Sequence, residues 1–159
     1  MPPGAEPLAL FKALGASPRH WGKFSAGSLL DKGPLSLRHR EIVIDRTTAR
    51  CGCEYEWGVH VQIFADRAGL SAAQLRSTVL GDAEDGNWTP EEAALIATVD
   101  ALLDRKRLGD AEFTRLRAHF DEPQIYEVIQ LVAFYHGVSL LCGAFDLPLE
   151  AGAARFPTA

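Results

Sequence analysis

The sequence predicts an all-α fold, a single helical domain over residues 1–159 with about six to seven helices. Apolar residues recur at three- and four-residue spacing through most of the chain, and helix-start signatures precede several of these stretches. No pair of segments shows the alternation of apolar and polar residues that paired strands require. A chain of 159 residues is the usual size of one domain, so we expect one hydrophobic core.

The N-terminal part of the chain predicts two short helices and one longer one. The short helices are expected near residues 7–14 and 18–30, and the longer one over residues 36–50. The last range contains EIVIDRTT, a run rich in β-branched residues that by itself favours a strand. Because no other segment offers a partner strand, and an unpaired strand is not a stable element, we expect a helix there.

A fourth helix is predicted over residues 54–68. The residues with helical spacing are Trp57, Val61, Phe64, Ala65 and Ala68. Gly69 follows them and tolerates the left-handed backbone that often ends a helix. We expect Tyr55 and Trp57 to be core or interface aromatics rather than substrate contacts.

Three further helix starts carry a capping side chain three residues before Glu or Gln, at Ser71, Thr89 and Asp121. The stretch after Thr89 has the stripe of a helix with one buried face, and Gly109 is expected to close the loop after it. The segment over residues 125–141 is apolar nearly all round, which predicts a central helix.

Composition limits the classes of function. A net charge of -5 argues against a nucleic-acid partner, because such proteins gather Lys and Arg on one surface. No continuous apolar run approaches the roughly 18 residues that span a bilayer, and the N-terminus has no secretory pattern. We therefore expect a cytoplasmic protein without a membrane partner. Three cysteines in such a protein are expected to stay reduced.

The most reactive stretch is CGCEYEWGVH, residues 51–60. If a helix begins near Cys53, then Cys53, Glu56 and His60 fall on one face, and the last two can hydrogen-bond directly. A carboxylate beside an imidazole fixes its tautomer and favours its protonated form. The helix dipole would raise the reactivity of Cys53, although the nearby carboxylates oppose this effect.

Two other interpretations of these residues remain open. A Glu/His pair four residues apart is often only a solvated surface pair, and a cysteine at a helix start is often a small buried apolar residue. A metal site would have to use Cys51, Cys53, Glu56 and His60, but Cys-x-Cys is not the usual zinc spacing. We expect neither a metal nor another cofactor.

The run REIVIDRTTARCGCEYEWGVHVQIFADRAG, residues 40–69, resembles the signature of the carboxymuconolactone decarboxylase and alkyl hydroperoxidase D (AhpD) family. The later EEAALIATVDALL and EVIQLVAFYHGVSLLCGAF resemble the next helices of that family, so the likeness covers roughly residues 30–148. The resemblance implies an AhpD-like helical bundle and a homo-oligomer, with assembly from trimers as one option.

The hydroperoxidase branch of this family has a Glu, eleven intervening residues and then Cys-x-x-Cys-x-x-x-His. On this chain the resemblance places Glu41 on the relay Glu and Cys53 on the first Cys, and His60 matches the His. The second Cys, which attacks peroxide in that branch, is replaced by Glu56.

In the decarboxylase branch, a Glu-x-x-x-His pair stands at this place, which Glu56 and His60 match. The resemblance therefore implies an enzyme doing acid/base chemistry on a small organic acid or lactone. In this hypothesis His60 is the general acid/base, Glu56 orients it and Glu41 completes the relay. Arg46 and Arg50 are candidates for holding a substrate carboxylate, although a salt bridge at the surface or at a subunit interface is the favoured role for both.

Two alternatives belong to other classes. The chain is an AhpD-like thiol peroxidase if Cys53 works with Cys51, although the ring that a Cys-x-Cys disulfide closes is strained. The third hypothesis is a non-catalytic helical oligomer whose motif serves packing. Cys142 is expected to be a buried structural thiol, and His136 either a core or a pocket residue.

Overall fold

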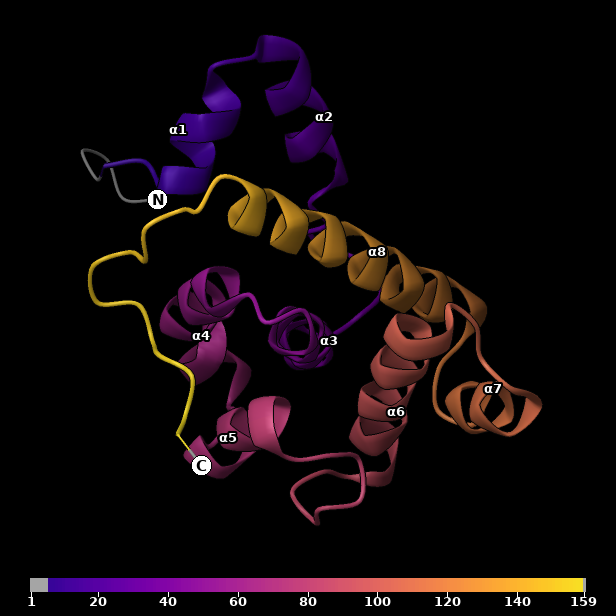
Figure 1. Cartoon of the computed structure of the whole chain (residues 1–159). Helices are drawn as coiled ribbons and strands as arrows, with labels where there is room; N and C mark the ends of the chain where they lie inside the picture. Colours follow the sequence, from indigo (N-terminus) through magenta and orange to yellow (C-terminus); the bar gives the residue numbers. More distant parts are fainter. Residues whose placement is uncertain (1–5, 159) are drawn as a thin grey trace.

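The computed structural model describes residues 6–158 and contains eight helices and no strand in that range (Figure 1). In chain order they are α1 (Ala9–Gly15), α2 (Pro18–Gly27), α3 (Leu37–Arg50), α4 (Glu54–Ala68), α5 (Ala72–Leu80), α6 (Pro90–Arg105), α7 (Asp110–Arg117) and α8 (Glu122–Ala144). The all-α prediction is confirmed. The helix that the sequence did not reveal is α7, which has eight residues and buries only Leu116 fully, too weak a pattern to recognise.

Helix α3 is the axis of the fold. Figure 1 shows it end-on at the centre, with α4, α5, α6 and α8 around it. Every residue from Arg40 to Thr48 is buried, so this helix packs on all sides. The predicted helix over residues 36–50 is confirmed, because tertiary burial of the β-branched run outweighs its weak preference for a strand.

The capping signatures also form as predicted. Ser71, Thr89 and Asp121 each accept a hydrogen bond from the third residue of their helix, and that residue's side chain accepts one in return. Gly69 adopts φ +65° after α4, the left-handed conformation that glycine permits at low cost. These caps fix where α4, α5, α6 and α8 begin or end.

Helix α8 is the longest and most apolar element. The mean hydropathy of an 18-residue window within α8 is 1.4, which is high enough for a membrane-spanning helix. The window is nevertheless interrupted by polar residues. Half of this window is buried inside the fold, where α8 packs against α3, α4 and α6. The packing is that of the core helix of a helical domain.

The two ends of the described chain complete the packing. The α1–α2 hairpin contacts α8 through aromatic side chains, with Phe24 and Phe134 ring centroids 5.2 Å apart. The segment after α8 runs along α4 toward α5, as Figure 1 shows. There the Tyr55 hydroxyl donates to Glu150 at 2.6 Å, and Phe156 packs edge-on against Trp57. The prediction that Tyr55 and Trp57 are core aromatics is confirmed.

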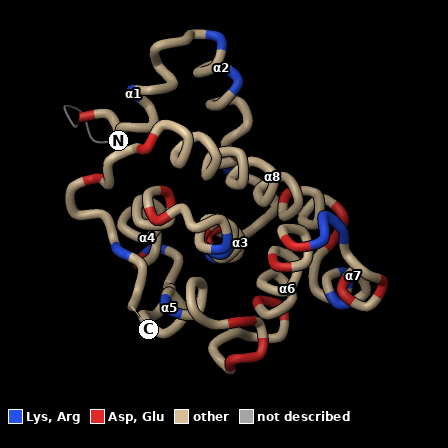
Figure 2. Tube along the Cα trace, in the orientation of Figure 1, with Lys and Arg blue, Asp and Glu red and all other residues tan. Residues whose placement is uncertain are grey.

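Acidic residues gather on α6 and on the loop before it (Figure 2). Three of them pair with arginines of α3: Glu92 with Arg38, Asp100 with Arg46 and Asp104 with Arg50. Arg46 makes two 2.8 Å hydrogen bonds to Asp100, and it also donates to the backbone carbonyls of Thr78 and Gly81. Its side chain is 4% exposed, whereas that of Arg50, which pairs with Asp104 at 2.7 Å, is 38% exposed. Arg46 therefore fastens α3 to α5 and α6 from inside.

Replacing Arg46 by Met should lower the free energy of unfolding by about 3–5 kcal/mol, because it leaves the carbonyls of Thr78 and Gly81 without their donor and reduces the partners of Asp100 to Arg50, 3.3 Å away. The matched variant Arg50→Met should cost at most about 1 kcal/mol, since exposed ion pairs contribute little. Urea unfolding followed by circular dichroism measures both. Equal losses in the two variants would contradict the structural role given to Arg46.

Candidate active site

His60 of α4 lies between two carboxylates. Its Nδ1 is 2.7 Å from Oε2 of Glu41, on α3, and its Nε2 is 3.5 Å from Oε1 of Glu56, one turn earlier on α4. All three side chains are buried. The predicted meeting of Glu41, Glu56 and His60 thus occurs in the fold, and the interpretation of Glu56 and His60 as a solvated surface pair is excluded by their burial.

The turn between α3 and α4 brings these residues together. Gly52 has φ +67°, which lets the chain reverse direction, and the Cys53 amide donates to the carbonyl of Thr48 at 2.9 Å. The hydroxyls of Thr47 and Thr48 donate to carbonyls one turn back on α3, so their burial leaves no hydroxyl unpaired. The turn therefore holds the first residues of α4 against the buried face of α3.

Arg40 supplies the positive charge behind the pair. Its Nε donates to Oε1 of Glu41 at 2.9 Å, and its Nη1 donates to the carbonyl of Leu30 at 3.1 Å. Glu41 therefore accepts from Arg40 with one oxygen and faces His60 with the other. Because a buried carboxylate is costly without partners, this double contact offsets the cost of burying Glu41 beside His60.

Burial by itself lowers the pKa of His60, but the hydrogen bonds to Glu41 and Glu56 and the charges of both carboxylates outweigh it and raise the pKa to about 10. The imidazole is therefore protonated at neutral pH and donates from both nitrogens. In this state His60 is an acid, and the Glu56 carboxylate, 3.5 Å from its Nε2, is placed to act as a base.

The sequence analysis missed Asp45. It lies four residues after Glu41 on α3 and is 1% exposed, and its Oδ1 has no hydrogen-bond partner among the described residues. Burial raises the pKa of Asp45 well above its usual range; the His60 charge opposes this shift and that of Glu41 adds to it. Asp45 therefore favours its neutral form. The spacing of four from Glu41 was the signal that would have placed it on the same helix face.

Glu56 and His60 line an apolar cavity of about 380 Å³ between α4, α8 and the α1–α2 hairpin. Glu41 and Asp45 lie behind His60, outside this lining. Most of the wall is aromatic or aliphatic, and its residues are Leu8, Phe11, Trp21, Phe24, Ser25, Ser28, Leu30, Val59, Ile63, Phe64, Phe134 and Tyr135. The cavity thus offers an apolar space in which one wall carries an acid and a base.

Cys53 is separated from this cavity. It caps the start of α4, as predicted, but it lines a different cavity together with Cys51 and Cys142. A hydrogen bond from the Cys142 thiol, the largest cause, and the Glu56 amide lower the pKa of Cys53 to about 7 against the opposing effect of burial. The sequence predicted that Cys53, Glu56 and His60 share one face of the helix. In the structure Glu56 and His60 line one cavity and Cys53 lines the other. For the same reason the residues considered for a metal site do not converge in the described part of the chain.

Arg46 and Arg50 are not substrate-binding residues of this site. Both are taken up by ion pairs with α6, and neither lines the cavity of Glu56 and His60. The helical periodicity of α3 places Glu41 on the face toward α4 and these two arginines on the face toward α6. His136 lines a pocket on another side of the molecule.

Comparison with known proteins agrees with this description. The model of the carboxymuconolactone decarboxylase family matches residues 16–100, more than half of the chain, and this range includes Glu41, Glu56 and His60. No curated protein matches the sequence.

Solved structures share the fold at low sequence identity. A protein of unknown function from Agrobacterium tumefaciens, proposed to be an antioxidant defence protein AhpD, is 22% identical with a TM-score of 0.75, covering 87% of this chain and 96% of that one. An uncharacterised peroxidase-related protein from Silicibacter sp. TM1040 is 16% identical with a TM-score of 0.80, over 93% of this chain and 80% of that one. The debrominase Bmp8 bound to 2,3,4-tribromopyrrole is 18% identical with a TM-score of 0.73, over 94% and 80%. These likenesses establish an AhpD-like fold.

The raised pKa of His60 makes stability depend on pH. Because the pKa rises from 6.5 to about 10 on folding, protonated His60 stabilises the fold. This contribution is fully present below pH 6.5 and is lost as the pH rises through about 10. Urea unfolding at a series of pH values should show this decline, and the difference between the parent and His60→Asn isolates it from other groups. Glu41→Gln should move the decline to lower pH. Parallel profiles for the parent and His60→Asn would disprove the buried ion pair.

Proposed function

Because the chain belongs to the carboxymuconolactone decarboxylase family, we propose that it is an enzyme that moves protons on a small organic molecule bound in the apolar cavity. The observation that carries this proposal is His60, buried between Glu41 and Glu56, with the Glu56 and His60 side chains on the cavity wall. Buried acid/base pairs with shifted pKa values in a cavity are typical of catalytic sites.

The two cavity-lining groups have complementary roles. The Glu56 carboxylate accepts a proton from a carbon next to the substrate carbonyl, while the His60 imidazolium donates one to the oxygen or carbon where negative charge develops. Glu41 and Arg40 do not reach the substrate; they are positioning residues that hold the imidazolium and balance its charge. Protonated Glu56 then returns a proton to a carbon of the enol while neutral His60 takes back the proton of the enol oxygen, which restores both groups. Exchange of the Glu56 proton with solvent before this return gives deuterium uptake in D2O.

The cavity favours a neutral, mainly apolar substrate. In the described structure its lining contains no Lys or Arg, while its polar end carries the Glu56 carboxylate. A substrate carboxylate would therefore lie beside the Glu56 carboxylate with no guanidinium to hold it, and the His60 imidazolium on the same wall is already paired with Glu41 and Glu56. Between the two substrate types expected from the sequence, this favours the lactone over the organic acid. Bmp8, which shares the fold, is named with a small neutral ring as its ligand.

Two further expectations from the sequence remain proposals. We propose that copies of the chain associate into a homo-oligomer and that the protein works in the cytoplasm. Both rest on the family resemblance and the composition, and size-exclusion chromatography with light scattering measures the first directly.

The proton-transfer proposal is tested with small lactones in D2O. The parent should exchange the proton next to the carbonyl of α-angelica lactone or α-phenyl-γ-butyrolactone, followed by proton NMR. Glu56→Gln and His60→Gln should slow this exchange by about 10²- to 10⁴-fold, the usual contribution of general acid/base groups.

Glu84→Gln, a change at an exposed carboxylate, is the control and should leave the rate unchanged. A carboxylated γ-butyrolactone with detection of released CO2 forms the second arm. The proposal fails if no lactone exchanges and no CO2 is released, or if His60→Gln retains the parent rate.

The preference for a neutral ligand is tested with p-cresol and p-toluate, which have similar rings and differ in charge at neutral pH. Isothermal titration calorimetry should show p-cresol binding at least about tenfold more tightly, a difference of about 1.4 kcal/mol. Glu56→Gln should narrow the ratio by improving the binding of p-toluate. Tighter binding of p-toluate to the parent would overturn the charge argument.

A further inference from the structure

Tyr135 of α8 lies next to the acid/base pair and has no role in the proton transfers described above. Its ring meets the His60 ring at 89°, with the two centroids 5.0 Å apart, and it also packs against the ring of Phe134. Tyr135 is 1% exposed and lines the same apolar cavity as Glu56 and His60. These contacts hold a phenol at the wall where the proposed reaction takes place.

The hydroxyl of Tyr135 has no hydrogen-bond partner among the described residues. It is also not sealed inside the core, because the one fully enclosed side-chain polar atom without a partner in the described part of the chain is Oδ1 of Asp45. The hydroxyl therefore reaches open space, and the space that Tyr135 lines is the cavity. Since a buried tyrosine hydroxyl normally has a partner, a molecule in the cavity is the expected one.

The other hydroxyl and imidazole groups of the cavity wall are already engaged. Ser25 and Ser28 donate to backbone carbonyls of α2, at 2.8 and 3.3 Å, so their protons are used within that helix. Each ring nitrogen of His60 faces a carboxylate. Within this group of the described lining, the hydroxyl of Tyr135 is thus the donor that can bind a ligand without first losing a protein partner.

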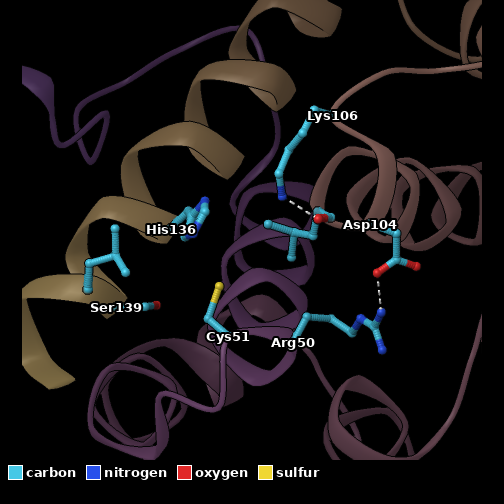
Figure 3. A pocket seen from close by; sticks show the side chains of 8 residues that line it. Arg50, Cys51, Asp104, Lys106, His136 and Ser139 are labelled. Atoms are coloured by element: carbon cyan, nitrogen blue, oxygen red, sulfur yellow. Dashed lines mark hydrogen bonds and ion pairs between the residues drawn. The ribbon is translucent and has the colours of Figure 1, made fainter.

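Helical periodicity separates this donor from the next residue of α8, His136. The imidazole of His136 turns to another pocket, of about 250 Å³, where Figure 3 shows it with Cys51, Lys106 and Ser139. His136 is therefore not available to the acid/base cavity. The polar group that α8 contributes to the described lining of that cavity is the phenol of Tyr135.

The environment of Tyr135 keeps its hydroxyl protonated. Burial, together with the charges of Glu56 and Glu41, raises the pKa of the phenol above its usual value. A neutral phenol donates one hydrogen bond and does not give up its proton near neutral pH. Tyr135 is therefore suited to bind and polarise an acceptor oxygen, whereas the protons move through Glu56 and His60.

We propose that the Tyr135 hydroxyl donates a hydrogen bond to the carbonyl oxygen of the molecule bound in the cavity. In the reaction it then stabilises the negative charge that this oxygen gains when Glu56 removes a proton from the neighbouring carbon. The catalytic part rests on the proposed proton-transfer function, whereas the binding part does not. Tyr135 keeps its own proton throughout, so Glu56 and His60 remain the groups that exchange protons with the substrate.

This assignment narrows the substrate class. The ligand has to carry a carbonyl oxygen that accepts from Tyr135 and, on the adjacent carbon, a hydrogen that Glu56 can remove. The rest of the molecule has to be apolar, because the remaining wall is mainly aromatic and aliphatic. Lactones and cyclic ketones meet these conditions. An ether of the same shape does not, because it leaves the phenol without an acceptor at this position.

The binding part is tested with α-phenyl-γ-butyrolactone, isotope-labelled at its carbonyl carbon, and with the corresponding phenyltetrahydrofuran, which keeps both rings but has no carbonyl. Infrared difference spectra should place the carbonyl band of the bound lactone at lower frequency in the parent than in Tyr135→Phe, because a hydrogen bond to the oxygen weakens the C=O bond. Isothermal titration calorimetry should show the parent binding the lactone about two- to tenfold more tightly than the ether, the effect of one hydrogen bond. Tyr135→Phe should remove this difference.

The catalytic part is tested by proton exchange of the same lactone in D2O. Tyr135→Phe should slow the exchange by about 10²- to 10³-fold, the usual effect of removing one donor to a developing oxyanion. Tyr126→Phe makes the same change at a 56% exposed tyrosine of the same helix and is the matched control, with the parent's band, affinity and rate expected. Because Tyr135→Phe leaves no described protein group unpaired, it should also unfold at the same urea concentration as the parent.

The results separate this inference from the proposed function. An unshifted carbonyl band in the parent, a band that stays shifted in Tyr135→Phe, or exchange at the parent rate in that variant would each overturn the role of Tyr135. If the parent exchanges no proton but its shifted band is lost in Tyr135→Phe, the proton-transfer function is refuted and Tyr135 remains the carbonyl-binding residue. The comparison of lactone with ether in the parent needs no variant, and equal affinities there would also overturn the proposal.

Discussion

The ion pair between Glu41 and His60 is the contact around which the site is built. The two side chains lie 2.7 Å apart and are almost fully buried, in surroundings where either charge alone would be costly. Arg40 stabilises Glu41 from the other side, so the charged groups form a chain from α3 to α4. Such a chain is stable only if α3 lies at the centre of the fold, where α4 and α8 both pack against it.

The central position of α3 also explains why two of its arginines, Arg40 and Arg46, have different partners. Arg40 points toward α4 and supports the acid/base pair, whereas Arg46, two turns on, points toward α5 and α6 and pairs with Asp100. Both are buried, and each one satisfies charges or carbonyls that the packing of α3 would otherwise leave unpaired. On the same helix, Arg40 thus supports the candidate site and Arg46 supports the packing of the fold.

The start of α4 links two cavities with different chemistry. Glu56 contributes its side chain to the apolar cavity beside His60, while its amide supports the Cys53 sulfur on the other side. The comparisons place the chain in its family, and solved structures with the same fold include proteins named for antioxidant defence and for debromination, so the fold by itself does not select among reactions.

The sequence by itself determined the helices other than α7, their caps and most of the candidate site. Capping boxes at Ser71, Thr89 and Asp121 and the spacing of Glu56 and His60 are local patterns, set by neighbours within one or two turns. The resemblance added Glu41, because its position relative to His60 is fixed by the family motif. Only the tertiary structure decided that Asp45 is buried beside this pair, that Arg46 is structural and that Cys53 and Cys142 line one cavity. These contacts join residues from helices far apart in sequence, or depend on which face of α3 is covered, and local spacing carries no information about either.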